Sequence, residues 1–390
     1  MRDVSRLIRA YYWYQAAANC VFFWPVFFLY YEQRAGLDVP TILRLQSYAV
    51  FVRAVLDVPF GALADRWSRR RCLEASSACF ALGSLGLLVL PTLAMAILAE
   101  TAFASAAALK SGADSAFLFD ALSSAGALDR YPQTEGRGQA TSSLASGATA
   151  VAGGFLAASD LRLPYVATLA AALAGVVVAA RLGGEETRRR LHARPGTLVV
   201  AAVRAARAPA VAWAIAAAAM AVTGSHVYFY FQQPWLHDLG VPVAAFGVVF
   251  AATKLVTALV AALAHRVDAG AGMRGTVALM AVVPAVGLGA MSAAHDPAAA
   301  ALPLTRGVLD GLWQPLANVW MNRLVDSDSR ATTLSLQSLV ARLLLAAALA
   351  VLGGATARFG LRGALAVAAG ALALAGAGLV VTGPGRRRTP

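Results

Sequence analysis

Charged residues are scarce in this chain of 390 residues, at 14% of the sequence, whereas an average soluble domain holds about 25%. Hydrophobic residues make up 59%, and the mean hydropathy is +0.64. This balance excludes a soluble globular protein. It indicates a membrane protein whose apolar residues are spread along the whole length.

Three further absences narrow the function. The three cysteines lack the spacing of a metal site, so we expect no bound metal. The sequence has no Walker-type phosphate loop, which argues against ATP-driven transport. It also has no cluster of nucleophile and base, so we predict that the protein is not an enzyme and needs no cofactor.

Charge clusters, prolines and glycines divide the chain into twelve apolar segments, and spanning a bilayer takes about 20 residues. None alternates with a period of two, and only helices and closed barrels satisfy their backbone in lipid. We therefore predict an all-α membrane protein with twelve transmembrane helices in two pseudo-symmetric halves of six. The predicted spans are residues 10–31, 41–63, 73–91, 93–120, 138–158, 164–182, 209–231, 243–264, 275–294, 298–321, 331–353 and 363–382.

An arginine-rich polar stretch near the middle of the chain, residues 183–207, is predicted to be a cytoplasmic linker. It separates an N-terminal half, residues 1–182, from a C-terminal half, residues 208–390. An internal repeat supports this division, because ALAHR at 262–266 echoes ALADR at 62–66.

The arginines are distributed unevenly along the predicted topology. With the N-terminus inside, most of them fall in inner loops and tails, and the outer loops hold only Arg34, Arg162, Arg358 and Arg362. The positive-inside rule then places both termini in the cytoplasm. This distribution explains the net charge of +13 without a nucleic-acid partner. The wealth of alanine and arginine is typical of a GC-rich bacterial genome, so we expect a bacterial cytoplasmic membrane.

Some charged side chains fall deep inside the predicted spans, where each costs at least ~2.5–3.5 kcal/mol. Three of these bases have an acid one helical turn later, on the same face. Either the pairs only neutralise each other, or their faces line a water-filled cavity that binds substrate and protons. Lys254, Arg342 and Glu100 have no such local partner, which favours the cavity. The deep charged residues are Arg53, Asp57, Glu100, Lys110, Asp114, Lys254, Arg306, Asp310 and Arg342.

Uncharged polar side chains in the spans are secondary candidates for the same cavity. Gln15 and Asn19 are one helical turn apart in the first span. His226 titrates near neutral pH if it is solvated, but a lone histidine in a helix is more often a hydrogen-bonded packing residue. The secondary candidates are Gln15, Asn19, His226, Gln314 and Asn318.

The loop after the second span carries a recognisable motif. Residues 61–73 read GALADRWSRRRCL, which resembles the G-x-L-A-D-R-x-G-R-R-x-x-L loop of the major facilitator superfamily. The chain also looks similar in topology over its whole length, and it resembles a bacterial branch of drug and metabolite transporters. The segment TAVAGG at 149–154 departs from the G-P-x-x-G-G motif of the antiporters, since Thr149 and Ala150 replace Gly-Pro.

The resemblance implies an inner gate. Asp65 would face the start of the eleventh span near residues 331–334, and Arg69 or Arg70 would pair with Asp120. Gly61 would allow close helix contact. The alternative is that this loop is a positive-inside anchor and nothing more. The gate residues implied are Gly61, Asp65, Arg66, Arg69, Arg70 and Asp120.

These observations predict a monomeric secondary active transporter that moves a small organic solute by alternating access. We expect proton-coupled export of a drug or metabolite by antiport, with the proton gradient as the energy source. The surplus of deep bases over deep acids favours an anionic or zwitterionic solute. Two alternatives stay open, namely import by proton symport or facilitated diffusion, and a non-transporting receptor or sensor on the same fold.

Overall fold

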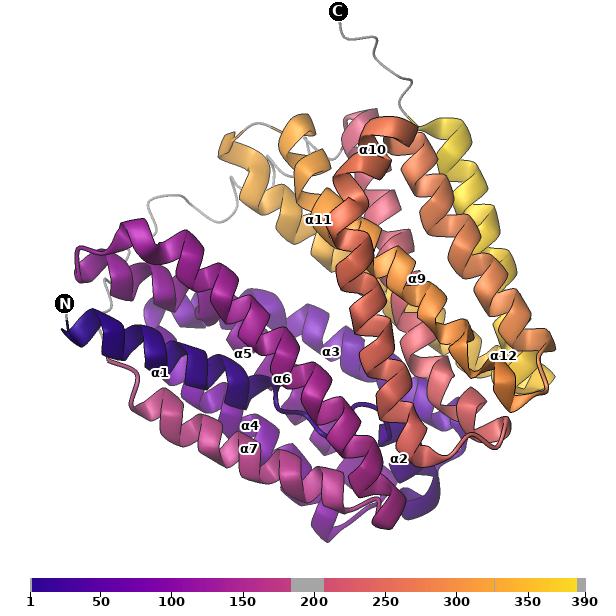
Figure 1. The fold of residues 1–390 in the computed structure, drawn as a ribbon, viewed down its shortest axis with the longest axis horizontal. Helices are drawn as coiled ribbons and strands as arrows, with labels where there is room; N and C mark the ends of the chain where they lie inside the picture. The colour runs from indigo at the N-terminus through magenta and orange to yellow at the C-terminus, as the bar shows by residue number, and fades with distance from the viewer. Residues whose placement is uncertain (1, 184–206, 326, 384–390) are drawn as a thin grey trace, which may run out of the picture. The chain divides into compact units, whose positions relative to one another are not determined.

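The computed structural model of the chain describes residues 2–183, 207–325 and 327–383 (Figure 1). Every regular element in these residues is a helix, and they contain no strand. Seven of the described helices are long and apolar enough to cross a membrane. The predicted all-α membrane class is confirmed. Most of the predicted linker, residues 184–206, falls outside the described residues.

The chain forms two compact units, each drawn mainly from one half of the sequence. Of the described residues, the first unit consists of 2–37, 48–183 and 242–250. The second consists of residues 38–47, 207–241, 251–325 and 327–383. Residues 38–47 and 242–250 therefore belong to the unit of the opposite half. The division into halves at residues 182 and 208 stays a prediction.

The first unit is a bundle in which α1 packs against α6 and α7, and α4 packs against α5 and α7 (Figure 1). Its core includes the fully buried side chains of Tyr11, Tyr14 and Leu73. The helices are α1 (Arg2–Asn19), α2 (Phe27–Ala35), α3 (Val39–Arg66), α4 (Arg69–Val89), α5 (Leu93–Ser124), the 3₁₀ helix η1 (Leu128–Arg130), α6 (Tyr131–Ser159) and α7 (Leu163–Ala180).

The first predicted span, residues 10–31, is wrong as a single helix. Helix α1 ends at Asn19, and α2 begins only at Phe27. Pro25 lies in the break, where its ring and missing N–H oppose a continuous helix. The freed N–H of Phe22 donates instead to Thr168 Oγ1 on α7, over 3.0 Å. The break is thus stabilised by a neighbouring helix, as an interrupted helix in lipid requires.

The second unit is built around α9, which packs against α11 and α12. Its helices are α9 (Pro209–Asp238), α10 (Val243–Ala293), the 3₁₀ helix η2 (Pro297–Leu304), α11 (Thr305–Leu324) and α12 (Ser327–Thr382). The tenth predicted span, residues 298–321, therefore begins as a 3₁₀ helix. Pro303 lies inside that stretch, where its missing N–H removes one hydrogen bond of a regular α-helix.

Helices α10 and α12 each contain two predicted spans. The loops predicted between those spans are largely helical, and each long helix turns at one glycine, Gly272 with φ 69° or Gly360 with φ 70°. Glycine suits both corners because its missing Cβ removes the penalty for positive φ. With α10 and α12 divided there, each of the twelve predicted spans has a helical counterpart in the described part of the chain.

Helix α6 begins almost two turns before the predicted span 138–158. Its first residue is Tyr131, and Pro132 lies at the helix start, a position that proline favours. Glu135 therefore lies within α6.

Candidate functional site

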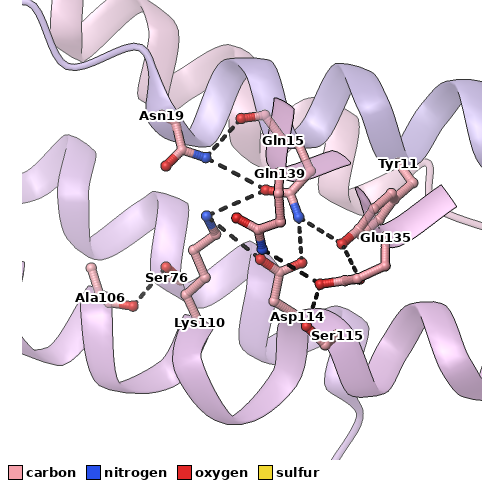
Figure 2. A network of polar contacts seen from close by, with 10 residues as sticks. All are labelled: Tyr11, Gln15, Asn19, Ser76, Ala106, Lys110, Asp114, Ser115, Glu135 and Gln139. Carbon is pink, nitrogen blue, oxygen red and sulfur yellow. Dashed lines mark hydrogen bonds and ion pairs between the residues drawn. The ribbon is translucent and has the colours of Figure 1, made fainter. Parts of the chain in front are cut away.

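Lys110 and Asp114 pair on α5 as their spacing predicts, with 3.6 Å between Nζ and Oδ2. Gln15 on α1 joins them (Figure 2). Its Nε2 donates to Asp114 Oδ1 over 2.8 Å, and its Oε1 accepts from Lys110 Nζ over 3.5 Å. Asn19 donates to the backbone oxygen of Gln15 over 2.8 Å. We call these four residues the α1–α5 cluster.

The α1–α5 cluster is sheltered but not sealed. Gln15 is only 1% exposed, whereas the side chains of Lys110 and Asp114 are 23% and 15% exposed. Each charged group therefore has both a protein partner and contact with its surroundings. This combination suits a site that exchanges protons or polar solute groups better than a sealed structural pair does.

A carboxylate that the sequence analysis missed extends the network. Tyr11 OH accepts from Gln15 Nε2 over 2.7 Å and donates to Glu135 Oε2 on α6 over 3.2 Å. Ser115 Oγ donates to Glu135 Oε1 over 2.7 Å (Figure 2). The sequence predicts a span that starts at residue 138, which places Glu135 in a loop, whereas α6 starts at Tyr131. Pro132 was the available signal, since proline marks the first helical turn.

The second unit holds a comparable cluster on α9, α10 and α11. Arg306 Nε lies 3.2 Å from Asp310 Oδ2, one turn along α11, and donates to Ser225 Oγ on α9 over 3.2 Å. The guanidinium lies over the ring of Phe229, 5.3 Å from its centre. Lys254 on α10 interacts electrostatically with Arg306 and Asp310. These five residues form the α9–α11 cluster.

The two clusters differ in their charge balance. The pair Lys110 and Asp114 is the sequence counterpart of Arg306 and Asp310, and both pairs are formed. The first pair has a carboxylate, Glu135, in its hydrogen-bond network, so negative groups outnumber positive ones there by one. The second has a further base nearby, Lys254, so basic side chains outnumber acidic ones by one. The first network therefore favours a cation and the second an anion.

The gate motif forms the ion pair that the resemblance implies. Arg69 Nη1 contacts Asp120 Oδ2, and it also donates to the backbone oxygen of Ala116 over 2.7 Å. Arg70 instead lies 3.3 Å from Glu74, one turn along α4. Of the two arginines proposed for Asp120, the structure selects Arg69.

The remaining gate residues contribute less to the described geometry. Helix α5 comes close to Gly61, because a Cβ on Gly112 would lie 3.1 Å from the Cα of Gly61. The close approach therefore depends on the absent Cβ of Gly112. The side chains of Asp65, Arg66 and Ala331 are not among those that the structure describes, so the expected contact of Asp65 is not part of the described structure.

Other predicted charges lie apart from the two clusters or keep local partners. Glu100 is 8% exposed and accepts from Tyr31 OH over 2.8 Å. It is ten residues from Lys110 on α5, roughly 15 Å along the helix. Asp57 Oδ1 accepts from Ser111 Oγ over 3.4 Å. Arg53, four residues before Asp57, is partly buried.

The other secondary candidates give weaker signals. His226 Nδ1 lies 2.8 Å from the backbone oxygen of Val222, a contact that suits the packing interpretation. Arg342 is partly buried on α12, and Gln314 is exposed on α11. The side chain of Asn318 lies outside the described residues.

A cavity of about 650 Å³ in the second unit is separate in character from both clusters. It is lined by residues of α9, α10 and α12, and its only side-chain hydroxyl among the lining residues is that of Thr223. Its size is that of a small-molecule site, roughly 300–1,000 Å³. Because no charged residue lines it, it does not provide a site for an ionic solute.

Comparisons with known proteins agree on one fold. The model of the Major Facilitator Superfamily matches residues 14–348. The search of curated proteins found no match. Among solved structures, the chain is similar to a mutant of the nucleoside transporter NupG, with a TM-score of 0.84 and 12% identity over 96% of this chain and 99% of that one.

Two other solved structures are similar in the same way. The peptide transporter POT gives a TM-score of 0.71 and 14% identity, over 96% of this chain and 93% of that one. A D-xylose–proton symporter gives 0.72 and 12%, over 98% of both chains. At these identities the likeness shows the fold alone.

Proposed function

The chain belongs to the major facilitator superfamily, and from this premise we propose that it is a proton-coupled secondary transporter of a small organic anion. Membrane transport follows from the family. The charge of the solute, the coupling ion and the direction are our proposal. Alternating access, with the proton gradient as energy source, needs no cofactor.

The geometry of Arg306 carries the proposal of an anionic solute. Both of its polar contacts use Nε, and its terminal nitrogens have no hydrogen-bond partner among the described residues. The ring of Phe229 and the fixed Nε hold the guanidinium in one orientation. A planar fork held in this way suits two parallel hydrogen bonds to a carboxylate or phosphate. Lys254 is a second basic side chain that interacts with it.

Asp310 does not cancel this preference. It occupies the Nε side of the guanidinium, so the two terminal NH₂ groups face elsewhere. Burial also matters, because Arg306 is 8% exposed and Asp310 5%. Charges removed from water interact more strongly than charges at a surface. An entering anion therefore gains more here than at an exposed arginine.

Proton coupling is proposed because the described clusters contain ionisable acids beside hydrogen-bond donors. The acids among the deep charged residues, which are candidates for proton carriage, are Asp57, Glu100, Asp114 and Asp310. Protonation of such a group changes its charge and thereby its hold on a neighbouring helix. This is the physical link between a proton gradient and a conformational change.

Export, by antiport of drugs or metabolites, is kept as the proposed direction. Two observations favour the second candidate, which is import by symport. A solved structure similar to this chain is a D-xylose–proton symporter, and the GP pair typical of antiporters is replaced by Thr149 and Ala150. The sign of solute movement under an imposed pH gradient in proteoliposomes separates the two.

The remaining parts of the proposal concern topology and the gate. We propose two pseudo-symmetric halves, residues 1–182 and 208–390, joined by a cytoplasmic linker, with both termini in the cytoplasm of a bacterial cell. The protein acts as a monomer in the cytoplasmic membrane. The Arg69–Asp120 pair, which joins α4 to α5, supports the proposal of an inner gate at these two helices.

The test of the anionic solute compares Arg306→Lys with Arg323→Lys on the same helix. Arg323 has a side chain 63% exposed and pairs with Asp268 over 3.6 Å, so it is a matched surface control. The probes are uridine and D-xylose, each beside its anionic counterpart, uridine 5′-monophosphate and D-xylonate.

We expect an anionic probe to raise the melting temperature of the wild type, and its neutral counterpart to have less effect. Lysine keeps the charge but not the fork, so Arg306→Lys weakens the response by roughly tenfold in affinity, the equivalent of about 1.4 kcal/mol. Arg323→Lys leaves the response unchanged. Equal responses of the two variants to every probe would contradict the proposed role of Arg306.

A further inference from the structure

Glu135 differs from Asp114 and Asp310 in its partners. Asp114 lies beside Lys110, at 3.6 Å, and Asp310 lies beside Arg306, at 3.2 Å. Glu135 accepts hydrogen bonds from three neutral groups, namely Tyr11 OH, Ser115 Oγ and Gln139 Nε2 at 3.4 Å (Figure 2). No basic side chain forms an ion pair with it within the described residues.

The network around Glu135 contains more acids than bases. The titratable side chains that interact with it are Tyr11 on α1 and Tyr131 on α6, and both also interact electrostatically with Asp114 on α5. Lys110 is the one base in this network, and it is committed to Asp114 and Gln15. Two carboxylates and one ammonium therefore belong to this network, so its acids outnumber its bases by one.

The hydrogen bonds of Glu135 suit both of its protonation states. The carboxylate accepts from Ser115 at Oε1 and from Tyr11 at Oε2. A hydroxyl is both donor and acceptor, and its hydrogen rotates. When a proton forms an O–H bond on Oε1, Ser115 Oγ at 2.7 Å accepts from it, while Tyr11 still donates to Oε2. The reverse step returns the proton to water.

A proton also fits the packing better than a larger cation does. Helix α6 approaches α1 so closely that a Cβ on Gly138 would lie 2.8 Å from Tyr11 Cε1 and 3.6 Å from Gln15 Cγ. Tyr11 is fully buried at this contact. In the described part of the chain no group of three His, Cys, Asp or Glu side chains is arranged to hold a metal ion.

We propose that Glu135 is the carboxylate that takes up and releases the coupling proton, with Ser115 as the hydroxyl that reverses its hydrogen bond. This inference rests on the proposed proton-coupled transport. Ionised Glu135 ties α6 to α1 through Tyr11 and to α5 through Ser115. Charge-assisted hydrogen bonds are the stronger kind. Protonation therefore loosens α6 from both helices, which is the movement that couples the proton to transport.

The first experiment needs no solute. Hydrogen–deuterium exchange of full-length protein in lipid nanodiscs is measured across pH, corrected for the intrinsic exchange rate, on peptides covering residues 131–145. In the wild type, protection of this segment falls by roughly five- to tenfold as the pH is lowered, because the ionic hydrogen bonds become neutral ones. Glu135→Gln shows the low protection at every pH.

Two further variants make the result specific. Glu32→Gln is the matched control, since Glu32 is a partly buried glutamate of the same unit on α2, and it behaves as the wild type. Tyr11→Phe removes a donor to the ionised carboxylate, so the pH midpoint of the change moves upward. Wild-type pH dependence in Glu135→Gln, or an unmoved midpoint in Tyr11→Phe, overturns the assignment.

The second experiment separates this inference from the proposed function. Proteoliposomes are loaded with the solutes named above, and flux is measured with and without a pH gradient. Glu135→Gln retains solute exchange at equal pH and loses accumulation driven by the gradient. Gradient-driven accumulation in Glu135→Gln equal to that of the wild type overturns the role of Glu135. Absence of all flux in the wild type contradicts the proposed function. The hydrogen–deuterium exchange experiment then still tests whether Glu135 takes up a proton.

Discussion

Arg69 and Arg70 are adjacent in sequence and identical in type, yet the structure predicts different consequences for their loss. Arg69 pairs with Asp120, and their side chains are only 13% and 7% exposed. Arg70 pairs with Glu74, with side-chain exposures of 41% and 28%. If both arginines were only positive-inside anchors, Arg69→Ala and Arg70→Ala would have the same effect.

The buried pair sets the size of the difference. Removing one partner of a buried ion pair costs about 3–5 kcal/mol, because the other charge is left without compensation. An exposed pair one helical turn apart contributes about 0.3–0.5 kcal/mol. A domain of this size changes its melting temperature by roughly 2–4 °C per kcal/mol. Arg69→Ala is therefore expected to lower it by roughly 6–20 °C, and Arg70→Ala by roughly 2 °C or less.

The assay is thermal unfolding of purified protein in one detergent, with binding to the membrane fraction as a check on insertion. A double variant, Arg69→Ala with Asp120→Asn, removes the orphaned charge and is expected to recover much of the lost stability. Equal shifts in Arg69→Ala and Arg70→Ala would refute the reasoning. So would a double variant that is no more stable than Arg69→Ala.

Two other predictions concern packing and the gate. A Cβ at Gly153 on α6 would lie 1.8 Å from a backbone oxygen, so Gly153→Ala should lower the free energy of unfolding by about 1–3 kcal/mol. A Cβ at Gly147 on the same helix meets nothing within 4 Å, so Gly147→Ala should not destabilise the protein. A Gly147→Ala variant less stable than Gly153→Ala would disprove the close contact. Asp65→Asn should reduce transport in proteoliposomes and leave membrane insertion intact. Asp129→Asn, at an exposed acid of η1, should change neither. Unaltered transport by Asp65→Asn would indicate that the motif is only a positive-inside anchor.

Local patterns were enough to predict much of this protein. Runs of apolar residues gave the helical class and the approximate spans, because a helix in lipid must satisfy its own backbone and cover about 30 Å. The pairs Lys110–Asp114 and Arg306–Asp310 followed from their spacing alone, since residues one turn apart share a helix face. The spacing held in both cases.

Side-chain contacts between different helices could not be predicted from the sequence. The amide of Gln15 bonding Asp114 and the tyrosine bonding Glu135 join residues far apart in the chain. Their partners depend on how α1, α5 and α6 rotate about their axes, and packing fixes that rotation. The choice of Arg69 over Arg70 for Asp120 has the same origin, because both arginines have the same chemistry.

The sequence by itself determined the all-helical membrane class, the approximate helical segments, and which charges fall within apolar segments. Only the tertiary structure decided which of those charges meet. It broke the first span at residues 20–26 and turned α10 and α12 at Gly272 and Gly360. The physical reason is range: helix formation is settled between residues four apart, whereas a binding network needs side chains brought together by packing across the whole bundle.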